Sequence, residues 1–136
     1  MNTFTDTLIG KAYRYAKKKH EGQKYGKKPF IYHPLEVAKI IKIICPTDIN
    51  LIAAAYLHDT LEDTNTSMYD LMNEFNNDIA SLVNEVTKTD YNTFPNLKTL
   101  RGVILKYADR TANLSNVHEW DIERQETYIL KSKFWM

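Results

Sequence analysis

LHDTLEDT, residues 57–64, places one histidine and three carboxylates within eight positions. If this stretch is helical, successive side chains are about 100° apart, so His58, Asp59, Glu62 and Asp63 share roughly 140° of one face. Carboxylates that close together repel one another and raise each other's pKa unless a cation neutralises them. The neighbouring imidazole makes a metal ion the natural cation. The alternative is a solvated acidic helix end, but the apolar run at 49–57 reads as a buried helix, which should not run into uncompensated charge.

The length and composition favour one soluble domain over residues 1–136. A chain of 136 residues with 43% hydrophobic and 26% charged residues can bury a real core. The net charge of +1 gives no overall field for nucleic acid or an acidic membrane, so we expect neither as a partner. We see no signal core and no apolar run of membrane-spanning length, which predicts a cytoplasmic protein. The single cysteine, Cys45, excludes an internal disulfide and a cysteine-only metal site.

The pattern along the chain predicts an all-α fold, a single helical bundle. Glycine and proline are scarce, with four of each, and alternation typical of strands is hard to find. On the helix at 97–116 we expect one core-facing stripe, made of Leu100, Val103, Ile104, Tyr107, Ala108, Thr111 and Leu114. Loops are expected at 21–33 and 87–96. Helices are expected at residues 4–20, 34–45, from 49 into the LHDTLEDT stretch, 68–75, 76–88, 97–116 and 122–133.

Two further positions can complete a metal site. His33 lies where a basic loop enters the second helix, and Asp109 follows an apolar run on the long helix, where an unpaired carboxylate would be costly. Taken singly, His33 could be a structural histidine, and Asp109 could pair with Arg110 or Lys106. Together with His58 and Asp59 they form a candidate ligand set.

This order of residues resembles the ligand set of the HD superfamily of metal-dependent phosphohydrolases. The agreement is closer with the RelA/SpoT-type hydrolase domain that acts on guanosine tetra- and pentaphosphate, (p)ppGpp. Its successive signatures resemble AKKKHEGQ at 16–23, PFIYHPLEVA at 29–38, HDTLEDT at 58–64, VTK at 86–88 and ADR at 108–110. The resemblance covers residues 5–116. It implies an HD-domain helical bundle, usually with Mn²⁺, and removal of pyrophosphate from the ribose 3′ position.

The residue types agree with that chemistry. Two imidazoles and two carboxylates leave open positions on a six-coordinate ion, which suits Mn²⁺ or Fe²⁺ better than a closed structural zinc site. We therefore predict a divalent metal, with Mn²⁺ favoured. Glu62 lies four residues after His58, and Asp63 lies four after Asp59, so each can reach a water at the metal and take its proton. The rival interpretation makes Glu62 and Asp63 an acidic pair at a helix end.

The resemblance also implies contacts with a nucleotide. Lys24 stands where the family has an arginine that packs on guanine, although a lysine reproduces guanidinium stacking poorly. Tyr25 stands where a second basic residue often follows, and a tyrosine can itself stack on a base. Asn113 matches an asparagine near the ribose and phosphate, and Lys88 borders the same site.

The sequence thus predicts a metal-dependent phosphohydrolase that removes the 3′-pyrophosphate of ppGpp or pppGpp. One alternative is an HD phosphohydrolase that acts on another nucleotide, either the 3′-like phosphate of NADPH or a nucleoside monophosphate. A second is a nucleotide-binding regulatory protein that keeps the fold without turnover. In each case the partner is a small-molecule nucleotide.

Overall fold

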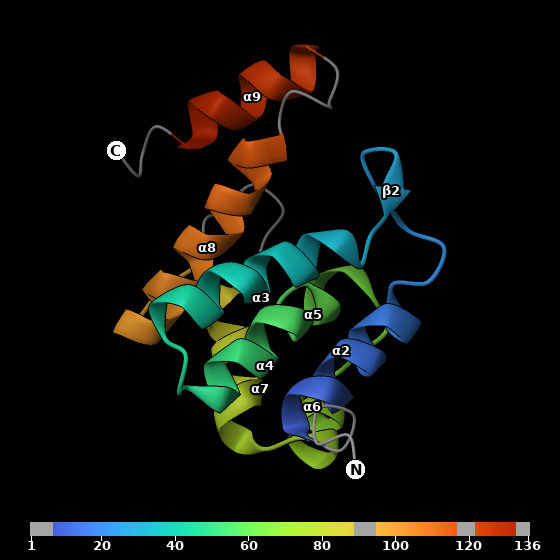
Figure 1. The fold of residues 1–136 in the computed structure, drawn as a ribbon, viewed down its shortest axis with the longest axis vertical. Helices are drawn as coiled ribbons and strands as arrows, with labels where there is room; N and C mark the ends of the chain where they lie inside the picture. The colour runs from blue at the N-terminus through green and yellow to red at the C-terminus, as the bar shows by residue number, and fades with distance from the viewer. Residues whose placement is uncertain (1–6, 89–94, 117–121, 133–136) are drawn as a thin grey trace.

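Helices account for most of the structure, a computed structural model that describes residues 7–88, 95–116 and 122–132 (Figure 1). The predicted all-α fold is confirmed, with one addition inside the expected loop at 21–33. There β1 and β2 pair antiparallel around Gly26, whose positive φ of 62° suits glycine. The elements are α2 (Leu8–Lys19), β1 (Lys24–Tyr25), β2 (Lys28–Pro29), α3 (Tyr32–Ile44), α4 (Ile49–Leu57), α5 (Thr60–Asp63), α6 (Met68–Glu74), α7 (Asn77–Val86), α8 (Leu100–Asn116) and α9 (Ile122–Ser132).

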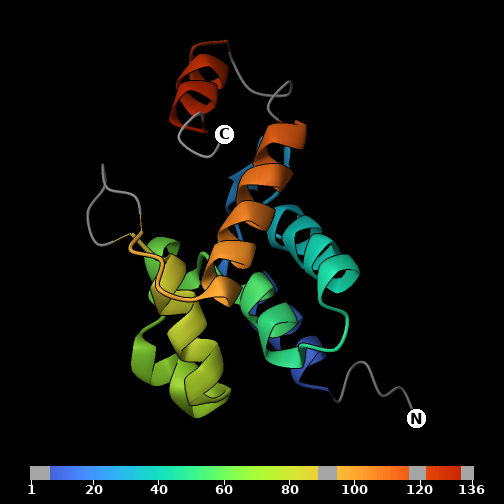
Figure 2. The same ribbon diagram turned by 90° about the vertical axis from the view of Figure 1, so that its left-hand side faces the viewer.

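The central element is α4, in which every residue from Leu51 to Leu57 is buried and only the first turn, at Ile49, is exposed. It packs against α2, α3 and α7, and α3 and α7 each pack against α8 (Figures 1 and 2). Asp48 caps its first turn by accepting a hydrogen bond from the Leu51 N–H at 3.1 Å. The residues that follow α4 are therefore held at the centre of the bundle.

The expected continuous helix through LHDTLEDT is wrong, because α4 ends at Leu57 and α5 begins at Thr60. Side chains complete the end of α4. The Thr60 hydroxyl donates to the Leu57 carbonyl, and His58 Nδ1 donates to the Ala55 carbonyl, both at 2.7 Å. His58 keeps helical backbone angles and Asp59 departs only modestly, with φ −101° and ψ 0°. The break therefore leaves both side chains facing the region where α3 and α8 meet.

The expected core-facing stripe of α8 is also wrong in part. Leu100 is 75% exposed and Tyr107 is 44% exposed, whereas polar residues on the same helix are buried. The buried residues of α8 are Gly102, Leu105, Lys106, Ala108, Asp109, Arg110, Ala112 and Asn116. Lys106 and Asp109 face the interior because they bond to each other and Asp109 bonds to His33. The spacing of apolar residues alone therefore predicts the wrong inner face for this helix.

Most of the remaining helix bounds follow the sequence closely, but α8 begins at Leu100, three residues after the expected start at residue 97. α3 begins at Tyr32, two residues before the expected start, so His33 lies in its first turn. α2 begins at Leu8, and the expected residues 4–6 of that helix lie outside the described ones. α9 lies beyond the C-terminal end of α8 (Figure 2). Within the described residues, none of the helices is both long and apolar enough to cross a membrane.

Candidate functional site

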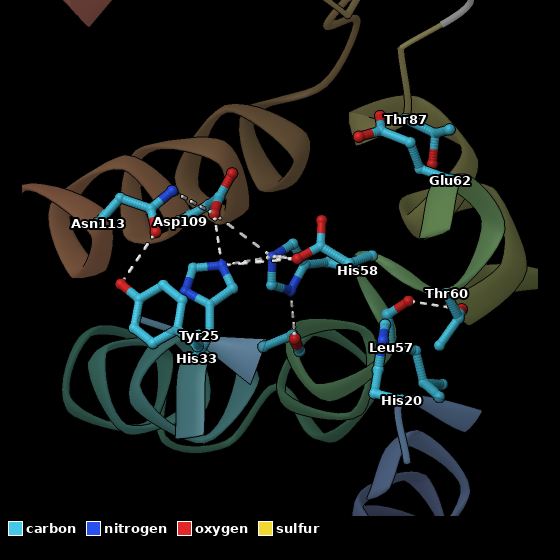
Figure 3. Close-up of polar contacts among 12 residues, drawn as sticks. His20, Tyr25, His33, Leu57, His58, Thr60, Glu62, Thr87, Asp109 and Asn113 are labelled. Atoms are coloured by element: carbon cyan, nitrogen blue, oxygen red, sulfur yellow. Dashed lines mark hydrogen bonds and ion pairs between the residues drawn. The ribbon is translucent and has the colours of Figure 1, made fainter. Parts of the chain in front are cut away.

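Four side chains from three separate parts of the chain meet between α3, α4 and α8. His33 comes from the first turn of α3, His58 and Asp59 from the junction of α4 and α5, and Asp109 from α8 (Figure 3). His33 Nε2 lies 3.2 Å from His58 Nε2 and 2.9 Å from Asp109 Oδ1. Asp59 Oδ2 lies 3.0 Å from His58 Nε2 and 3.5 Å from His33 Nε2. The sequence therefore identified four residues that the fold brings together.

Hydrogen bonds and charge orient these groups. Because a carbonyl only accepts, the bond from His58 Nδ1 to Ala55 places a proton on Nδ1 and leaves the Nε2 lone pair of the neutral ring toward the centre. Burial alone would lower the pKa of His58, but the Asp59 and Asp109 carboxylates outweigh it and hold that pKa well above its ordinary value. The buried Asp109 and partly buried Asp59 carboxylates thus face two imidazoles and favour a positive charge between them.

Lys106 holds the other side of Asp109. Its Nζ lies 3.1 Å from Asp109 Oδ2, and both side chains are almost fully buried. Burial would raise the pKa of Asp109, but the Lys106 ammonium and the two imidazoles outweigh it, so the pKa stays well below its ordinary value. Oδ2 is therefore engaged by the lysine, while Oδ1 faces the histidines.

The donor set fits a divalent metal ion. The measured separations between donor atoms of His33, His58, Asp59 and Asp109 run from 2.9 to 3.5 Å. Neighbouring ligands about 2.1 Å from one ion and at right angles around it lie about 3.0 Å apart. Two nitrogen and two oxygen donors suit a borderline divalent ion with open positions better than a closed zinc site. These separations are therefore compatible with the four residues as ligands of one such ion.

Two more carboxylates, those of Glu62 and Asp63, lie on α5, one helical turn further along the chain than His58 and Asp59. Carboxylate oxygens of Asp59, Glu62 and Asp63 come within 4.8 Å of one another. Burial and the neighbouring charges of Asp59 and Glu62 raise the pKa of Asp63 to about 6. Glu62 Oε1 accepts the Lys88 backbone N–H at 3.3 Å, and Gln23 Nε2 donates to the Asp63 carbonyl at 2.9 Å. α5 is thus tied to the end of α7 and to the loop before β1.

A pocket of about 270 Å³ opens beside the candidate metal ligands and the carboxylates of α5. Its wall combines carboxylates, cationic side chains and aromatic rings, a combination that suits a phosphorylated ligand with a planar group. The lining residues are Tyr25, Phe30, His33, Asp59, Glu62, Asp63, Lys88, Lys106, Asp109, Arg110, Asn113 and Arg124.

Known proteins resemble this chain in sequence and fold. The family model described as HD domain matches residues 12–97, more than half of the chain. A guanosine-3′,5′-bis(diphosphate) 3′-pyrophosphohydrolase, MESH1 of Xenopus tropicalis, is 33% identical over 90% of the chain and 79% of that protein. The chain belongs to the HD-domain family, and within it to the RelA/SpoT-type hydrolases. MESH1 of Drosophila melanogaster is 29% identical to this HD domain, over 98% of the chain and 85% of that protein.

A solved structure agrees with the fold of this HD domain. It is described as a metazoan orthologue of SpoT that hydrolyses ppGpp, and it superposes with a TM-score of 0.83 at 28% identity, covering 93% of this chain and 82% of that one. Longer bacterial relatives match only in part. The HD domain spans 18% of a GTP pyrophosphokinase from Myxococcus xanthus and 19% of a 3′-pyrophosphohydrolase from Aquifex aeolicus.

The residues predicted to contact a nucleotide differ in where the HD domain places them. Lys88 and Asn113 line the pocket, and Asn113 Nδ2 lies 3.5 Å from Asp109 Oδ1. Tyr25 also lines it but is 94% buried, with its ring against His33. Lys24 is exposed on β1 and is not among the described residues that line the pocket. The proposed guanine contact of Lys24 stays a prediction.

Sequence reasoning did not assign Phe30, Lys106, Arg110 or Arg124 to the site, yet all four line the pocket. Lys106 was considered only as a rival partner of Asp109. Its position three residues earlier on a helix that turns out to bury both was the available signal. Arg124 belongs to α9, and nothing in the sequence links that helix to the pocket.

Proposed function

We propose that this HD domain hydrolyses the 3′-pyrophosphate of guanosine tetraphosphate and pentaphosphate. The observation that carries the proposal is the meeting of His33, His58, Asp59 and Asp109 beside a pocket that has both carboxylates and cations on its wall. The activity named for the Xenopus and Drosophila relatives supports the same substrate.

We assign His33, His58, Asp59 and Asp109 to a divalent metal, with Mn²⁺ as the preferred ion. When bound, such an ion supplies Lewis-acid chemistry that polarises a phosphate oxygen and makes water more acidic. Lys106 keeps Asp109 Oδ2 engaged, so Oδ1 is the oxygen available on the histidine side.

Asp63 takes a proton from the attacking water, and Glu62 orients that water. Asp63 is the proton acceptor, because its carboxylate lines the pocket and lies beside that of the candidate ligand Asp59, within reach of a water at the metal. Glu62, fixed by the Lys88 N–H, orients the water beside it. The water oxygen attacks the phosphorus attached to the ribose 3′ oxygen, and that phosphorus–oxygen bond breaks. The ribose 3′ oxygen is the leaving group, pyrophosphate is released as the product that carries the water oxygen, and the proton taken by the carboxylate balances the one that the 3′ oxygen takes up.

Lys88, Lys106 and Arg110 provide positive charge around the 3′-pyrophosphate group that water attacks. Ammonium and guanidinium groups bind phosphate oxygens by charge-assisted hydrogen bonds, which hold the phosphoryl group in place and stabilise the negative charge on its oxygens as water attacks. The proposal also includes one catalytic domain over residues 1–136, a cytoplasmic location, and a free nucleotide rather than nucleic acid or a membrane as the partner.

The test is a substrate panel with purified protein, with and without Mn²⁺. Pyrophosphate should be released from ppGpp only with the metal. Asp59→Ala should lose bound metal and activity together, whereas Glu62→Gln and Asp63→Asn should retain the metal and lose activity about 100-fold or more. Glu21→Gln, at an exposed site outside the pocket lining, is the matched control and should behave like the wild type.

The panel separates the alternatives. Cleavage of NADPH or a nucleoside monophosphate with ppGpp left intact would show that the substrate assignment is wrong while the hydrolase assignment holds. Tight binding of ppGpp and Mn²⁺ without phosphate release would favour a regulatory protein.

A further inference from the structure

Tyr25 on β1 joins two halves of the site that are far apart in the sequence. Its side chain is buried, with 6% exposed, although the neighbouring Lys24 is exposed. The Tyr25 hydroxyl lies 3.0 Å from Asn113 Oδ1 and 3.4 Å from the Ala112 carbonyl, both on α8. The ring packs against His33 on α3, with ring centroids 4.8 Å apart and planes tilted by 32°. One tyrosine therefore touches a candidate metal ligand and a residue of the pocket wall.

The hydroxyl contact bears on which way the Asn113 amide points. Asp109 Oδ1 can only accept a hydrogen bond, so the Asn113 atom 3.5 Å from it is the Nδ2 donor. The oxygen end then faces Tyr25, whose hydroxyl donates to it (Figure 3). A flipped amide would place two acceptor oxygens, those of Asn113 and Asp109, against each other. The phenol and the carboxylate thus select the same orientation, which leaves the amide N–H groups toward Asp109 and the pocket.

The packing of the Tyr25 ring argues against direct stacking of this ring on a nucleobase. One ring face lies against the His33 imidazole, and the edge of Phe30 meets the ring at 84° with centroids 6.4 Å apart. Because Tyr25 packs against both rings and forms a hydrogen bond through its hydroxyl, it is a structural part of the pocket wall and does not offer a free ring face on which a base could stack.

We propose that Tyr25 is a positioning residue that acts through Asn113: its hydroxyl fixes the Asn113 amide so that Nδ2 is presented to the phosphorylated ribose in the pocket. This inference rests on the proposed function, because it assigns the amide to that substrate. It differs from the interpretation in which Tyr25 stacks on the base, since in that case Tyr25 would act independently of Asn113.

A double-mutant cycle of Tyr25→Phe and Asn113→Ala tests the inference. Tyr25→Phe keeps the ring on His33 and removes only the hydroxyl. It should raise KM for ppGpp about three- to tenfold, the effect of one neutral hydrogen bond, with kcat and Mn²⁺ affinity within twofold of the wild type. In the Asn113→Ala background the same change should have no further effect on KM. An equal rise in KM in both backgrounds would overturn the inference and favour direct contact with the base.

A second readout does not depend on turnover. The Asn113 side-chain amide signals in a ¹H–¹⁵N spectrum, assigned by their absence in Asn113→Ala, should shift or broaden in Tyr25→Phe. Unchanged signals would overturn the inference. Wild-type protein that fails to cleave ppGpp would instead overturn the proposed function, and the spectrum would still decide whether Tyr25 fixes the amide.

Tyr15→Phe is the matched control. Tyr15 also has a hydroxyl contact, 3.3 Å from Thr66 Oγ1, and an edge-on ring contact with Phe75, but it lies outside the pocket lining. Its loss should leave KM and the Asn113 signals unchanged. A rise in KM equal to that of Tyr25→Phe would show a general packing effect and would contradict the inference.

Discussion

Gly102 makes room for a carboxylate that caps α8, the helix that carries Asp109. Glu85 of α7 accepts the backbone N–H groups of Lys98 and Thr99, each at 2.8 Å, and the Thr99 hydroxyl at 2.8 Å. A Cβ added to Gly102 would overlap the Glu85 carboxyl group. The change Gly102→Ala should therefore expel Glu85 from the start of α8.

Two opposing effects determine the size of this change. Alanine inside a helix is favoured over glycine by about 1 kcal/mol. Loss of a side-chain cap costs about 0.5 to 2 kcal/mol, and Glu85 accepts three donors, which places its loss near the upper limit. Gly102→Ala should thus lower the free energy of unfolding by about 1 kcal/mol. In a Glu85→Ala background the space is clear, and the same change should raise that free energy by about 1 kcal/mol.

Urea denaturation followed by circular dichroism, on the wild type, both single variants and the double variant, measures this coupling. The expected non-additivity is about 2 kcal/mol, well above the error of the method. Each 1 kcal/mol should move the melting temperature by about 3 °C. Stabilisation by Gly102→Ala in both backgrounds would refute the reasoning, because it would mean that Glu85 moves aside without loss of the cap.

Two further predictions concern the ion pairs of α8. Lys106→Met should weaken Mn²⁺ binding about 10- to 100-fold, measured by titration calorimetry, because Lys106 holds one oxygen of Asp109. Lys42→Met is the control: it removes a partly buried lysine bound to a tyrosine hydroxyl and should leave the Mn²⁺ affinity unchanged. Tighter Mn²⁺ binding by Lys106→Met would show that charge repulsion outweighs positioning. Arg101→Met should lower the free energy of unfolding by about 1 kcal/mol at pH 7, allowing for screening of half-exposed groups. The hydrogen bond from Arg101 lowers the pKa of Asp78, so its contribution is present above the ordinary aspartate pKa and is lost on acidification. The difference between variant and wild type in urea titrations should shrink below about pH 4 and not grow.

The candidate metal centre could be predicted because charged residues in apolar surroundings destabilise the fold unless they bind a partner. Asp109 at the end of an apolar run, and a histidine followed by acids after the buried helix α4, are charged groups whose burial has to be compensated by partners. The ordered motifs then linked them to His33. The structure places all of these side chains within hydrogen-bond distance of at least one other.

Other features depended on contacts that only the fold creates. The break between α4 and α5 arises from the Thr60 hydroxyl and the His58 ring, which bond backward to carbonyls that a continuous helix would have used. Arg124 reaches the pocket from α9, a placement that local pattern does not encode. Lys24 was assigned by motif position, yet the short hairpin leaves it exposed and turns Tyr25 inward.

α8 shows why the site and the fold could not be predicted separately. Asp109 lies seven residues after Gly102 and Asn113 lies eleven after it, so all three share one face of the helix. That face packs against α3 and α7, with Glu85 filling the space at Gly102 and Tyr25 and His33 meeting Asn113 and Asp109. A stripe of apolar residues predicts the inner face only where the core is apolar. Here the inner face is partly polar because the candidate site is itself the contact between α3 and α8, and the exposed Leu100 and Tyr107 are the consequence.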